Sequence, residues 1–420
     1  QGRSALVLFS HNQCAKCFHY KKTLEFPKSN RTTPGRRKAV TVVAPNCVCY
    51  NECEMNPSEL QKAFQSAKRL LIVRLSSIGD VITGTPVPSA IKRIRPDIHI
   101  AWIVEDRSHQ VLIRNPWIDE VIVAPRSEWT VKWRQRRYSE VLVETAKFIR
   151  SIRKRGFDIA LDLQGRLKSS LLAYLSGAPV RIGHADATEK SRILYTHAFR
   201  VTKDVRRASE RSLRLLEPLG IPYCPMNLYI PLEQNDFESA ETVLTNLGVK
   251  EPFAALCPAT TFQTKFWTPS AFAQVADGLR LRFGLPSVVM GTAADIPLAQ
   301  QIASLASEKV AVAAGLTSLR SAAGILSRAS VVVSVDTGLL FAALAVGTPV
   351  VGIFGPTPHD HLRDERITVV CKQFSCSPCW RKPRCTSGRD CMLAVTPEEV
   401  LNAVEALLLS YHVPSSVASP

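Results

Sequence analysis

The chain has no apolar run long enough to form a membrane-spanning helix. Such a helix needs about 20 consecutive apolar residues. Even "ASVVVSVDTGLLFAALAVGTPVVGIFG" is interrupted by Asp336, Gly338, Gly347 and Pro349. The stretch "ALVLFS" near the start is too short and too weakly flanked for a secretory signal. We therefore expect a cytoplasmic protein, and a start at Gln1 rather than Met is compatible with a fragment or a misjudged start.

Two nucleotide-binding signatures and one metal-binding signature are also missing. The chain contains neither the dinucleotide pattern Gly-x-Gly-x-x-Gly nor the Walker pattern. Their absence argues against NAD binding and against ATP hydrolysis. No ligand cluster of the Asp-x-Asp kind occurs. We therefore expect no cofactor and no metal in the chemistry.

Cysteine is scarce in the central part of the chain. Of the 12 cysteines, five lie in the first 53 residues and five between Cys371 and Cys391, which leaves only Cys224 and Cys257 between the clusters. Disulfide frameworks are typical of small secreted domains. In a long chain without a secretory signal, the two clusters indicate metal ligands or reduced thiols instead.

The two cysteine clusters differ in spacing. The second has the pattern C-x2-C-x5-C-x5-C, which suits zinc or an iron–sulfur cluster, with reduced or partly oxidised thiols as the alternative. Its members are Cys376, Cys379, Cys385 and Cys391. The first cluster combines "CAKC" with "CVC" and fits no standard zinc finger, although zinc stays an alternative there. Its members are Cys14, Cys17, Cys47, Cys49 and Cys53.

Basic residues are in excess. Lys and Arg outnumber Asp and Glu by 53 to 36, a formal net charge of +17. This favours anionic partners such as phosphorylated sugars, anionic lipids or nucleic acid, or simply a soluble basic surface. Between Arg126 and Arg155 there are 10 Lys or Arg and 3 Asp or Glu, interleaved with Trp129, Trp133 and Tyr138. We expect this segment to contact an anionic membrane surface. Nucleic acid is the rival partner, but no recognised nucleic-acid-binding fold accompanies the segment.

The length and the apolar pattern predict two domains. Residues 1–67 include the polar, turn-rich stretch "KSNRTTPGRRK" and are expected to be a poorly ordered appendage. An α/β domain is expected over residues 68–225, because continuous apolar runs alternate with helical stretches, as in a parallel sheet covered on both faces. We expect its strands at 69–75, 98–105, 120–125 and 157–165, and its helices at about 86–95 and 138–154.

A second α/β domain is expected over residues 226–410, followed by a tail at 411–420. The proline-containing stretch "GIPYCPMNLYIPLEQN" is the expected link between the domains. Thr268 before Pro269 predicts a helix start, and Thr396 with Glu399 predicts a capping box. We expect strands at 252–260, 286–292, 330–338 and 350–357, and helical stretches at 268–284, 318–329, 339–349 and 396–409.

Polar residues follow one strand in each half. Ligands of open parallel sheets bind outside the carboxyl ends of the strands. Asp80, in "SSIGD", would therefore face the crevice, with an ordinary helix cap as the alternative role. Thr337 and Gly338, in "SVDTG", stand where a helix N-terminus could hold a diphosphate, with a plain turn as the alternative.

Four motifs in order carry a family resemblance. The chain resembles the ADP-heptose:lipopolysaccharide heptosyltransferases of glycosyltransferase family 9 over roughly residues 69–409. The resemblance implies a GT-B fold, in which two tandem doubly wound, Rossmann-like domains face an interdomain cleft. The first domain would bind the acceptor and the second the nucleotide sugar. The motifs are "RLLIVRLSSIGDVITGTPVPSAIK", "FDIALDLQGRLKSSLLAYLSGAPVRIG", "PATTFQTKFWTPSAFAQVADGL" and "VVVSVDTGLLFAALAVGTPVVGIFGPT".

The resemblance also implies residue roles. Asp80 matches the family's proposed catalytic base, Lys265 a lysine that contacts the donor phosphates, and Asp336 an aspartate that contacts the sugar. A sugar that leaves from a diphosphate develops negative charge, which Lys265 and helix amides can stabilise without a metal. Asp295 matches the position of an acidic residue that holds the adenosine ribose. The implied donor set is Thr260, Thr261, Lys265, Asp295, Asp336, Thr337 and Gly338.

On the acceptor side, Arg166 and Lys168 follow a strand and could bind phosphate or carboxylate groups, with a solvated helix start as the alternative. The implied acceptor set is Ser77, Gly79, Gln164, Arg166 and Lys168. The chain departs from the family at Phe341, where His is common, and this puts the donor sugar in question.

The expected function is transfer of heptose, or a related sugar, from an ADP-sugar to a lipid-linked lipopolysaccharide-core oligosaccharide. We expect a monomer without nucleic acid that works peripherally at the inner face of the inner membrane. The alternatives are another GT-B transferase or a sugar-nucleotide epimerase, a non-catalytic sugar-nucleotide binder, and a zinc-containing nucleic-acid-binding protein.

Overall fold

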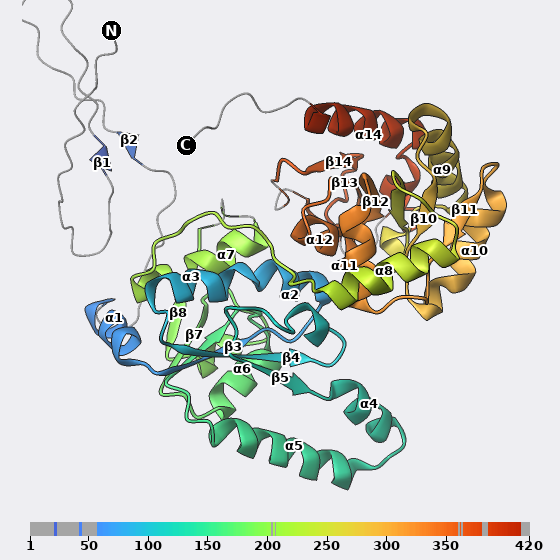
Figure 1. Cartoon of the computed structure of the whole chain (residues 1–420). Helices are drawn as coiled ribbons and strands as arrows, with labels where there is room; N and C mark the ends of the chain where they lie inside the picture. The colour runs from blue at the N-terminus through green and yellow to red at the C-terminus, as the bar shows by residue number, and fades with distance from the viewer. Residues whose placement is uncertain are drawn as a thin grey trace, which may run out of the picture.

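The computed structural model describes residues 21–22, 42–43, 57–202, 205, 207–359, 362, 364–379 and 385–412. Apart from a short antiparallel pair, β1 (Lys21–Lys22) with β2 (Val42–Val43), these residues form two tandem α/β domains (Figure 1). Within these ranges no helix combines the length and the apolar character needed to cross a membrane.

The first domain is built on a fully parallel six-stranded sheet in the order β5-β4-β3-β6-β7-β8. Alternate residues of the central strand face opposite sides, since Leu70 and Ile72 pack with α1, α2 and α3, whereas Leu71 and Val73 pack with α5 and α6. Its strands are β3 (Arg69–Val73), β4 (His99–Glu105), β5 (Glu120–Ala124), β6 (Ile159–Asp162), β7 (Val180–His184) and β8 (His197–Phe199). Its helices are α1 (Pro57–Ser66), α2 (Ile78–Gly84), α3 (Pro86–Ile94), η1 (His109–Val111), α4 (Arg126–Arg134), α5 (Tyr138–Arg153), α6 (Leu167–Leu175), η2 (Ser191–Leu194), α7 (Ala208–Arg214) and η3 (Glu217–Leu219).

The second domain repeats this plan with the parallel order β11-β10-β9-β12-β13-β14. Helices α9, α10 and α14 pack in one core on one face of the sheet, and α8, α11 and α12 share the core that reaches the first domain. The strands are β9 (Ala254–Cys257), β10 (Ser287–Val289), β11 (Val310–Val312), β12 (Val331–Val335), β13 (Val350–Phe354) and β14 (Ile367–Cys371). The helices are α8 (Gln234–Asn246), η4 (Gln263–Lys265), α9 (Pro269–Phe283), η5 (Ala293–Asp295), α10 (Ile296–Leu305), α11 (Leu319–Arg328), α12 (Gly338–Ala345), α13 (Asp390–Leu393) and α14 (Pro397–His412).

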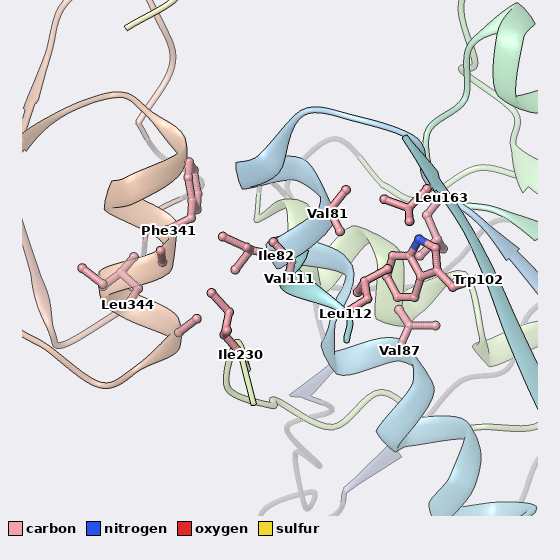
Figure 2. Packing of buried hydrophobic residues seen from close by; sticks show 14 of the residues in the cluster. Val81, Ile82, Val87, Trp102, Val111, Leu112, Leu163, Ile230, Phe341 and Leu344 are labelled. Atoms are coloured by element: carbon pink, nitrogen blue, oxygen red, sulfur yellow. The ribbon is translucent and has the colours of Figure 1, made fainter. Parts of the chain in front are cut away.

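The two domains meet through an apolar contact between α2 and α12. Figure 2 shows Phe341 and Leu344 of α12 on one side and Ile82 of α2 on the other, with Ile230 of the connecting segment beside them. All four are nearly or fully buried. The contact joins helices that each follow the central strand of a sheet, so it holds the carboxyl ends of the two sheets in a defined relation.

The strand orders place the expected site segments at the points where each sheet reverses its winding. In such sheets the ligand crevice opens where neighbouring strands send their connections to opposite sides. In the first domain this point lies between β3 and β6, which precede Asp80 and Gln164. In the second it lies between β9 and β12, which precede Thr260 and Asp336.

The helix starts that depend on local residues are as expected. The Thr268 hydroxyl accepts a hydrogen bond from the Ala271 amide at 3.2 Å. In the capping box of α14, the Thr396 amide donates to Glu399 at 3.0 Å and the Glu399 amide to the Thr396 hydroxyl at 3.3 Å.

Helix α2 was not expected. Its sequence, IGDVITG, has two glycines and four β-branched residues, which are poor helix formers. Five of its seven residues are nevertheless buried, so tertiary packing decides its conformation.

Helix α1 corrects the expected extent of the appendage. Leu60 and Phe64 lie at 2 % and 0 % exposure in the core of the first domain. The Arg95 guanidinium also donates hydrogen bonds to the Phe64 and Gln65 carbonyls, at 2.7 and 2.6 Å, near the end of this helix. Residues 57–66 therefore belong to the first domain. The remainder of the expected appendage, with its five cysteines, lies outside the described residues except for β1 and β2, and so does the tail beyond residue 412.

Candidate active site between the domains

A cavity of about 910 Å³ opens between the domains. The first domain contributes side chains from the ends of β3, β6 and β7 and from α2 and α7, and the second contributes the segments that follow β13 and β14. The polar and ionisable residues in its wall include Arg74, Asp80, Gln164, Arg166, His184, Asp186, Arg211, Thr357, His359 and Lys372. Cations outnumber carboxylates in this set, so the cavity suits an anionic ligand.

Asp80 lies in the first turn of α2 and fills two roles at once. Its Oδ2 accepts hydrogen bonds from the Ser77 amide and hydroxyl, both at 3.0 Å, which is a capping-box arrangement. Its Oδ1 lies 3.3 Å from Nη2 of Arg74, and half of the side chain is exposed in the cavity. The sequence leaves a catalytic base and a helix cap as alternative roles for Asp80, and its position in the structure is compatible with both.

The electrostatic surroundings keep Asp80 ionised. Removal from bulk water raises the pKa of this carboxyl, but the Arg74 charge and the Ser77 hydrogen bonds outweigh that effect, and the pKa lies below its usual value. Asp80 is therefore a carboxylate near neutral pH, oriented by two neighbours and open to the cavity on its remaining side.

Arg74 was missed in the sequence. It ends the apolar run of β3, where a lone charge is itself a signal of a polar environment. Arg74 is 7 % exposed, and its Nη1 donates to the Leu163 carbonyl at 2.8 Å. Because this bond ties β3 to the end of β6, Arg74 holds Asp80 in a fixed relation to the loop that begins at Gln164.

Lys265 and Asp336, separated by 71 positions in the chain, form an ion pair of 2.6 Å in the second domain. The Thr357 hydroxyl donates to the same Oδ2 at 2.8 Å, and the Thr260 hydroxyl reaches the Asp336 carbonyl at 3.4 Å. Thr357 also lines the cavity, so it connects this group to the interdomain space. The structure thus brings together three of the expected donor residues and adds Thr357.

The remaining expected donor residues lie in different settings. Thr337 is the N-cap residue of α12. A methyl group at Gly338 would lie 3.0 Å from Ile78, so a side chain there would press on the first domain. Thr261 is exposed beside Thr260. Asp295 accepts hydrogen bonds from the Thr292 amide and hydroxyl, at 2.8 and 2.6 Å, and is not part of the cavity wall.

The acceptor residues divide into two groups. Gln164 and Arg166 line the cavity, whereas Lys168 does not. The Lys168 ammonium lies 2.9 Å from Glu105, which also binds Arg126 at 2.8 Å. The Lys168 ammonium is therefore held by an acid of the protein, and the Arg166 guanidinium, which lines the cavity, is the better candidate to meet an anionic acceptor.

Ser77 and Gly79 act through α2 itself. Ser77 orients the Asp80 carboxylate, as described above. A methyl group on Gly79 would lie 2.6 Å from the ring of Phe341, so this position allows α12 to approach α2 closely. Neither residue is in the cavity wall.

A buried aspartate shapes the Gln164 loop. Asp162 is fully buried and accepts hydrogen bonds from the Gln164 amide at 2.8 Å, the Ser169 hydroxyl at 2.8 Å and the Tyr195 hydroxyl at 2.7 Å. Burial raises the pKa of Asp162 despite these hydrogen bonds. The Asp162 carboxyl therefore connects the Gln164 loop, helix α6 and the Tyr195 side chain. This residue was not singled out in the sequence.

His184 is a further residue that sequence reasoning missed. It ends β7, is 7 % exposed and lines the cavity, and within the described residues its Nδ1 has no hydrogen-bond partner. Burial and the nearby Arg211 charge lower the pKa of His184 to about 4, although Asp186 opposes the shift. The imidazole is therefore neutral near pH 7. Its place directly after an apolar strand run was the available signal.

Part of the second cysteine cluster's segment lines the cavity, through Ser377 and Pro378. Cys371, which precedes the cluster, is also a wall residue, and its Sγ lies 3.4 Å from Nε2 of His359. The described cysteines from Cys224 to Cys391 are free thiols. Within the part of the chain that the structure describes, no group of three or more His, Cys, Asp or Glu residues is arranged to hold a metal ion.

The comparison with known families decides the class of protein. The profile described as "Glycosyltransferase family 9 (heptosyltransferase)" matches residues 145–388, more than half of the chain. The chain belongs to glycosyltransferase family 9. It is therefore a glycosyltransferase with the GT-B fold, and this confirms the expected fold class. Among the alternatives, the epimerase and the zinc-containing nucleic-acid-binding protein are not supported.

Curated relatives of this glycosyltransferase cover most of its length. It is 28 % identical to lipopolysaccharide heptosyltransferase 1 of Pseudomonas aeruginosa over 364 residues, which span 81 % of the chain and 98 % of that protein. It is 24 % identical to lipopolysaccharide heptosyltransferase 3 of Escherichia coli over 339 residues, which span 79 % of the chain and 95 % of the relative.

Solved structures agree with the fold. The family 9 glycosyltransferase of Veillonella parvula superposes with a TM-score of 0.67 at 24 % identity and covers 82 % of this chain and 97 % of its own. The E. coli heptosyltransferase WaaC with ADP-2-deoxy-2-fluoro heptose has a TM-score of 0.61 at 25 % identity, covering 80 % of this chain and 99 % of its own.

Proposed function

We propose that this glycosyltransferase moves a heptose, or a related sugar, from an ADP-sugar to a hydroxyl of a lipopolysaccharide-core acceptor, without a metal ion. One observation carries the proposal. The Asp80 carboxylate lines the interdomain cavity, and the Lys265–Asp336 pair reaches the same cavity through Thr357. Support comes from the relatives named lipopolysaccharide heptosyltransferases and from the solved E. coli enzyme that holds an ADP-sugar analogue.

In the proposed reaction, Asp80 is the general base. The acceptor hydroxyl attacks the anomeric carbon, the bond from that carbon to the diphosphate oxygen breaks, and the hydroxyl proton passes to Asp80. A carboxylate of low pKa is a weak base, but the hydroxyl becomes acidic as the new bond forms, so the transfer belongs to the transition state. Arg74 and Ser77 hold the carboxylate in place for this step.

The second domain would stabilise the leaving ADP. Lys265 is paired with Asp336. A donor diphosphate would compete for the Lys265 ammonium and release Asp336 to accept hydrogen bonds from sugar hydroxyls. The amides at the N-terminus of α12 add donors for the phosphate oxygens. A cation and fixed amides can neutralise the charge that develops on the diphosphate, which is the task a metal performs in other transferases.

The first domain would hold an anionic acceptor. Arg166 and Arg211 line the cavity near Gln164, and Arg211 is matched by Asp186 at 2.9 Å. Guanidinium groups suit carboxylates and phosphates because they can form two parallel hydrogen bonds. We further propose that the protein acts as a monomer, makes peripheral contact with an anionic membrane at its cytoplasmic face, and does not bind nucleic acid.

A ligand screen followed by a transfer assay tests the proposal. The full chain is heated alone and with ADP-, UDP-, GDP- or CMP-sugars at about 100 times the dissociation constant, where selective binding adds about 2.7 kcal/mol to the free energy of unfolding. ADP-sugars should raise the melting temperature most, and ADP-heptose should then yield a glycosylated acceptor and free ADP. A preference for another nucleotide, or sugar that stays on the nucleotide, would refute the proposal.

A further inference from the structure

Exposed apolar side chains gather on one side of the first domain. Of the 19 large hydrophobic side chains exposed among the described residues, nine lie on α4, α5, α6 and η2. They are Val131, Trp133, Tyr138, Leu142, Val143, Leu167, Leu171, Tyr174 and Ile193. A concentration of apolar side chains on a soluble surface marks an interaction site.

Helices α4 and α5 have little contact with the core, which explains the exposure. No residue of α4 is buried, and Ile152 near the end of α5 is the one buried residue of that helix. Figure 1 shows the two helices as an outer layer of the first domain, beyond its sheet. Leu142 and Val143 are 65 % and 53 % exposed. Helix α5 thus turns Phe148 and Ile152 toward the core and leaves Leu142 and Val143 on its outer face.

The cations of the same region exceed what its own carboxylates can match. The three acids of α4 and α5 are bound by Lys132, which pairs with Glu128 and Glu144, and by Arg137, which pairs with Glu140. Arg126 and Arg155 pair with acids of β4 and β5. Six cations are left without an acidic partner among the described residues, namely Arg134, Arg136, Lys147, Arg150, Arg153 and Lys154.

The unpaired cations and the exposed apolar residues lie on the same helix faces. Residues three or four positions apart lie on one face of a helix. Val143, Lys147 and Arg150 of α5 and its C-cap residue Lys154 follow this spacing and are all exposed. In η2, Ile193 is 80 % exposed beside Arg192.

A second apolar row leads to the cavity. Leu167, Leu171 and Tyr174 occupy positions i, i+4 and i+7 of α6, and each is more than 40 % exposed. Arg166, one residue before this row, lines the cavity. The apolar face thus begins at the side of the cavity where the acceptor is proposed to bind.

We propose that α4, α5, α6 and η2 form a membrane-docking face, which rests on an anionic lipid bilayer while the cavity receives the head group of a lipid-anchored acceptor. The lipid-anchored acceptor rests on the proposed function, whereas the bilayer contact rests on the surface alone. Cations flanking apolar side chains suit the interfacial region of a bilayer, where the charges meet anionic head groups and the apolar tips enter the acyl boundary. Six of the nine apolar residues are aliphatic and offer no stacking surface for bases, which argues against nucleic acid.

Vesicle binding by the full-length protein tests the docking face. The probes are phosphatidylcholine vesicles with and without about one-third phosphatidylglycerol, at low and at high salt. One variant reverses two free cations, Lys147→Glu with Arg150→Glu, and another removes apolar contact, Leu142→Ser with Val143→Ser. All four side chains are exposed and outside the cavity wall, so folding should be unaffected.

Matched controls come from the second domain. Lys250→Glu with Lys309→Glu makes the same change in net charge at exposed positions, and Leu281→Ser with Leu305→Ser removes side chains that are 75 % and 51 % exposed. Each cation near an anionic surface contributes a factor of about five, so the Lys147/Arg150 variant should bind anionic vesicles at least about 25-fold more weakly. The control variants should stay within about twofold of wild type, as expected for surface changes away from the contact.

Three outcomes would overturn the docking face. The first is unchanged vesicle binding in the Lys147/Arg150 variant, and the second is an equal loss in the Lys250/Lys309 control. The third is a wild-type protein that binds RNA but no vesicles, with RNA binding lost in the docking variants.

Transfer to a soluble, delipidated acceptor should be normal in the docking variants, whereas transfer to an acceptor embedded in vesicles should fall. Vesicle binding that depends on Lys147 and Arg150 in a protein without ADP binding would refute the proposed function and leave the docking face intact.

Discussion

The ring of Phe341 packs directly on Gly79, so closely that a methyl group at Gly79 would lie 2.6 Å from Cδ2 of the ring. Gly79 precedes Asp80 in the chain, and Phe341 lies in the first turn of α12. The pair therefore connects the proposed base to the helix whose N-terminus is proposed to face the diphosphate. The family resemblance puts a histidine at this position, whereas here the side chain is 9 % exposed and belongs to the apolar core between the domains.

This packing predicts that Phe341→His destabilises the protein rather than restoring a donor contact. Burial of an imidazole among apolar groups should lower the free energy of unfolding by about 1–3 kcal/mol, measured by denaturant titration. ADP affinity should stay within about threefold of wild type. Phe341→Leu is the control and should be milder, because it keeps an apolar side chain. Tighter binding of an ADP-sugar by the histidine variant would show that the position contacts the donor.

Asp80→Asn should separate catalysis from capping. The amide keeps the size and much of the capping ability of the carboxylate but cannot accept the proton, so turnover should fall by at least about 100-fold. The melting temperature should change by a few degrees at most, and ADP affinity should be normal. Thr396→Ala, which removes the hydroxyl from the capping box of α14, is the matched control and should turn over normally. If Asp80→Asn retained turnover within about threefold at saturation, its role would be that of a cap.

Lys265→Ala should weaken ADP binding. Loss of a charged hydrogen bond to phosphate costs about 1–3 kcal/mol, which corresponds to roughly a 5- to 150-fold increase in the dissociation constant in titration calorimetry. Lys309→Ala removes an exposed cation of the same domain and serves as the control. Equal ADP affinity in the two variants would remove Lys265 from the donor site.

His184 should contribute to acid sensitivity. Its pKa is about 4 in the folded protein and 6.5 as the ordinary value, so the unfolded chain binds the proton more readily. The associated stability is present above pH 6.5 and is lost as the pH falls toward 4, by up to about 3 kcal/mol.

His184→Asn should lack this part of the pH dependence in denaturant titrations between pH 7 and 4. His197, whose pKa is also lowered by burial, contributes to the same range in both proteins, so the difference between them isolates His184. Parallel stability curves for wild type and variant would contradict a neutral, buried His184.

Helix α1 should be needed for stability, in contrast to the part of the chain before it. A chain that begins at Pro57 keeps Leu60 and Phe64 in the core, whereas one that begins at Ala67 exposes the apolar surface that they cover. Loss of buried Leu or Phe side chains costs about 2–5 kcal/mol each. The shorter chain should therefore melt well below the longer one in calorimetry. Equal melting temperatures would return α1 to the appendage.

The sequence by itself determined the elements whose signals are local. Apolar runs alternating with helical stretches predict two parallel sheets, because strands buried on both faces must be apolar throughout. Thr268 and the Thr396–Glu399 pair predict helix starts, since each cap is formed within one turn. The four motifs indicated the family before any geometry was known. Helix α2 escaped this reasoning because its glycines and β-branched residues disfavour a helix that burial imposes.

Only the tertiary structure decided which partners the polar residues have. Lys168 looks like an acceptor ligand in the sequence, yet its charge is taken by Glu105, 63 positions away. Lys265 and Asp336 are 71 positions apart and meet because β9 and β12 are neighbours in the sheet. Arg74 and His184 each stand at the end of a strand, a local signal that does not identify their partners. The free energy of a charged group depends on the groups that surround it after folding, and chain spacing does not specify those when they come from other strands or from the other domain.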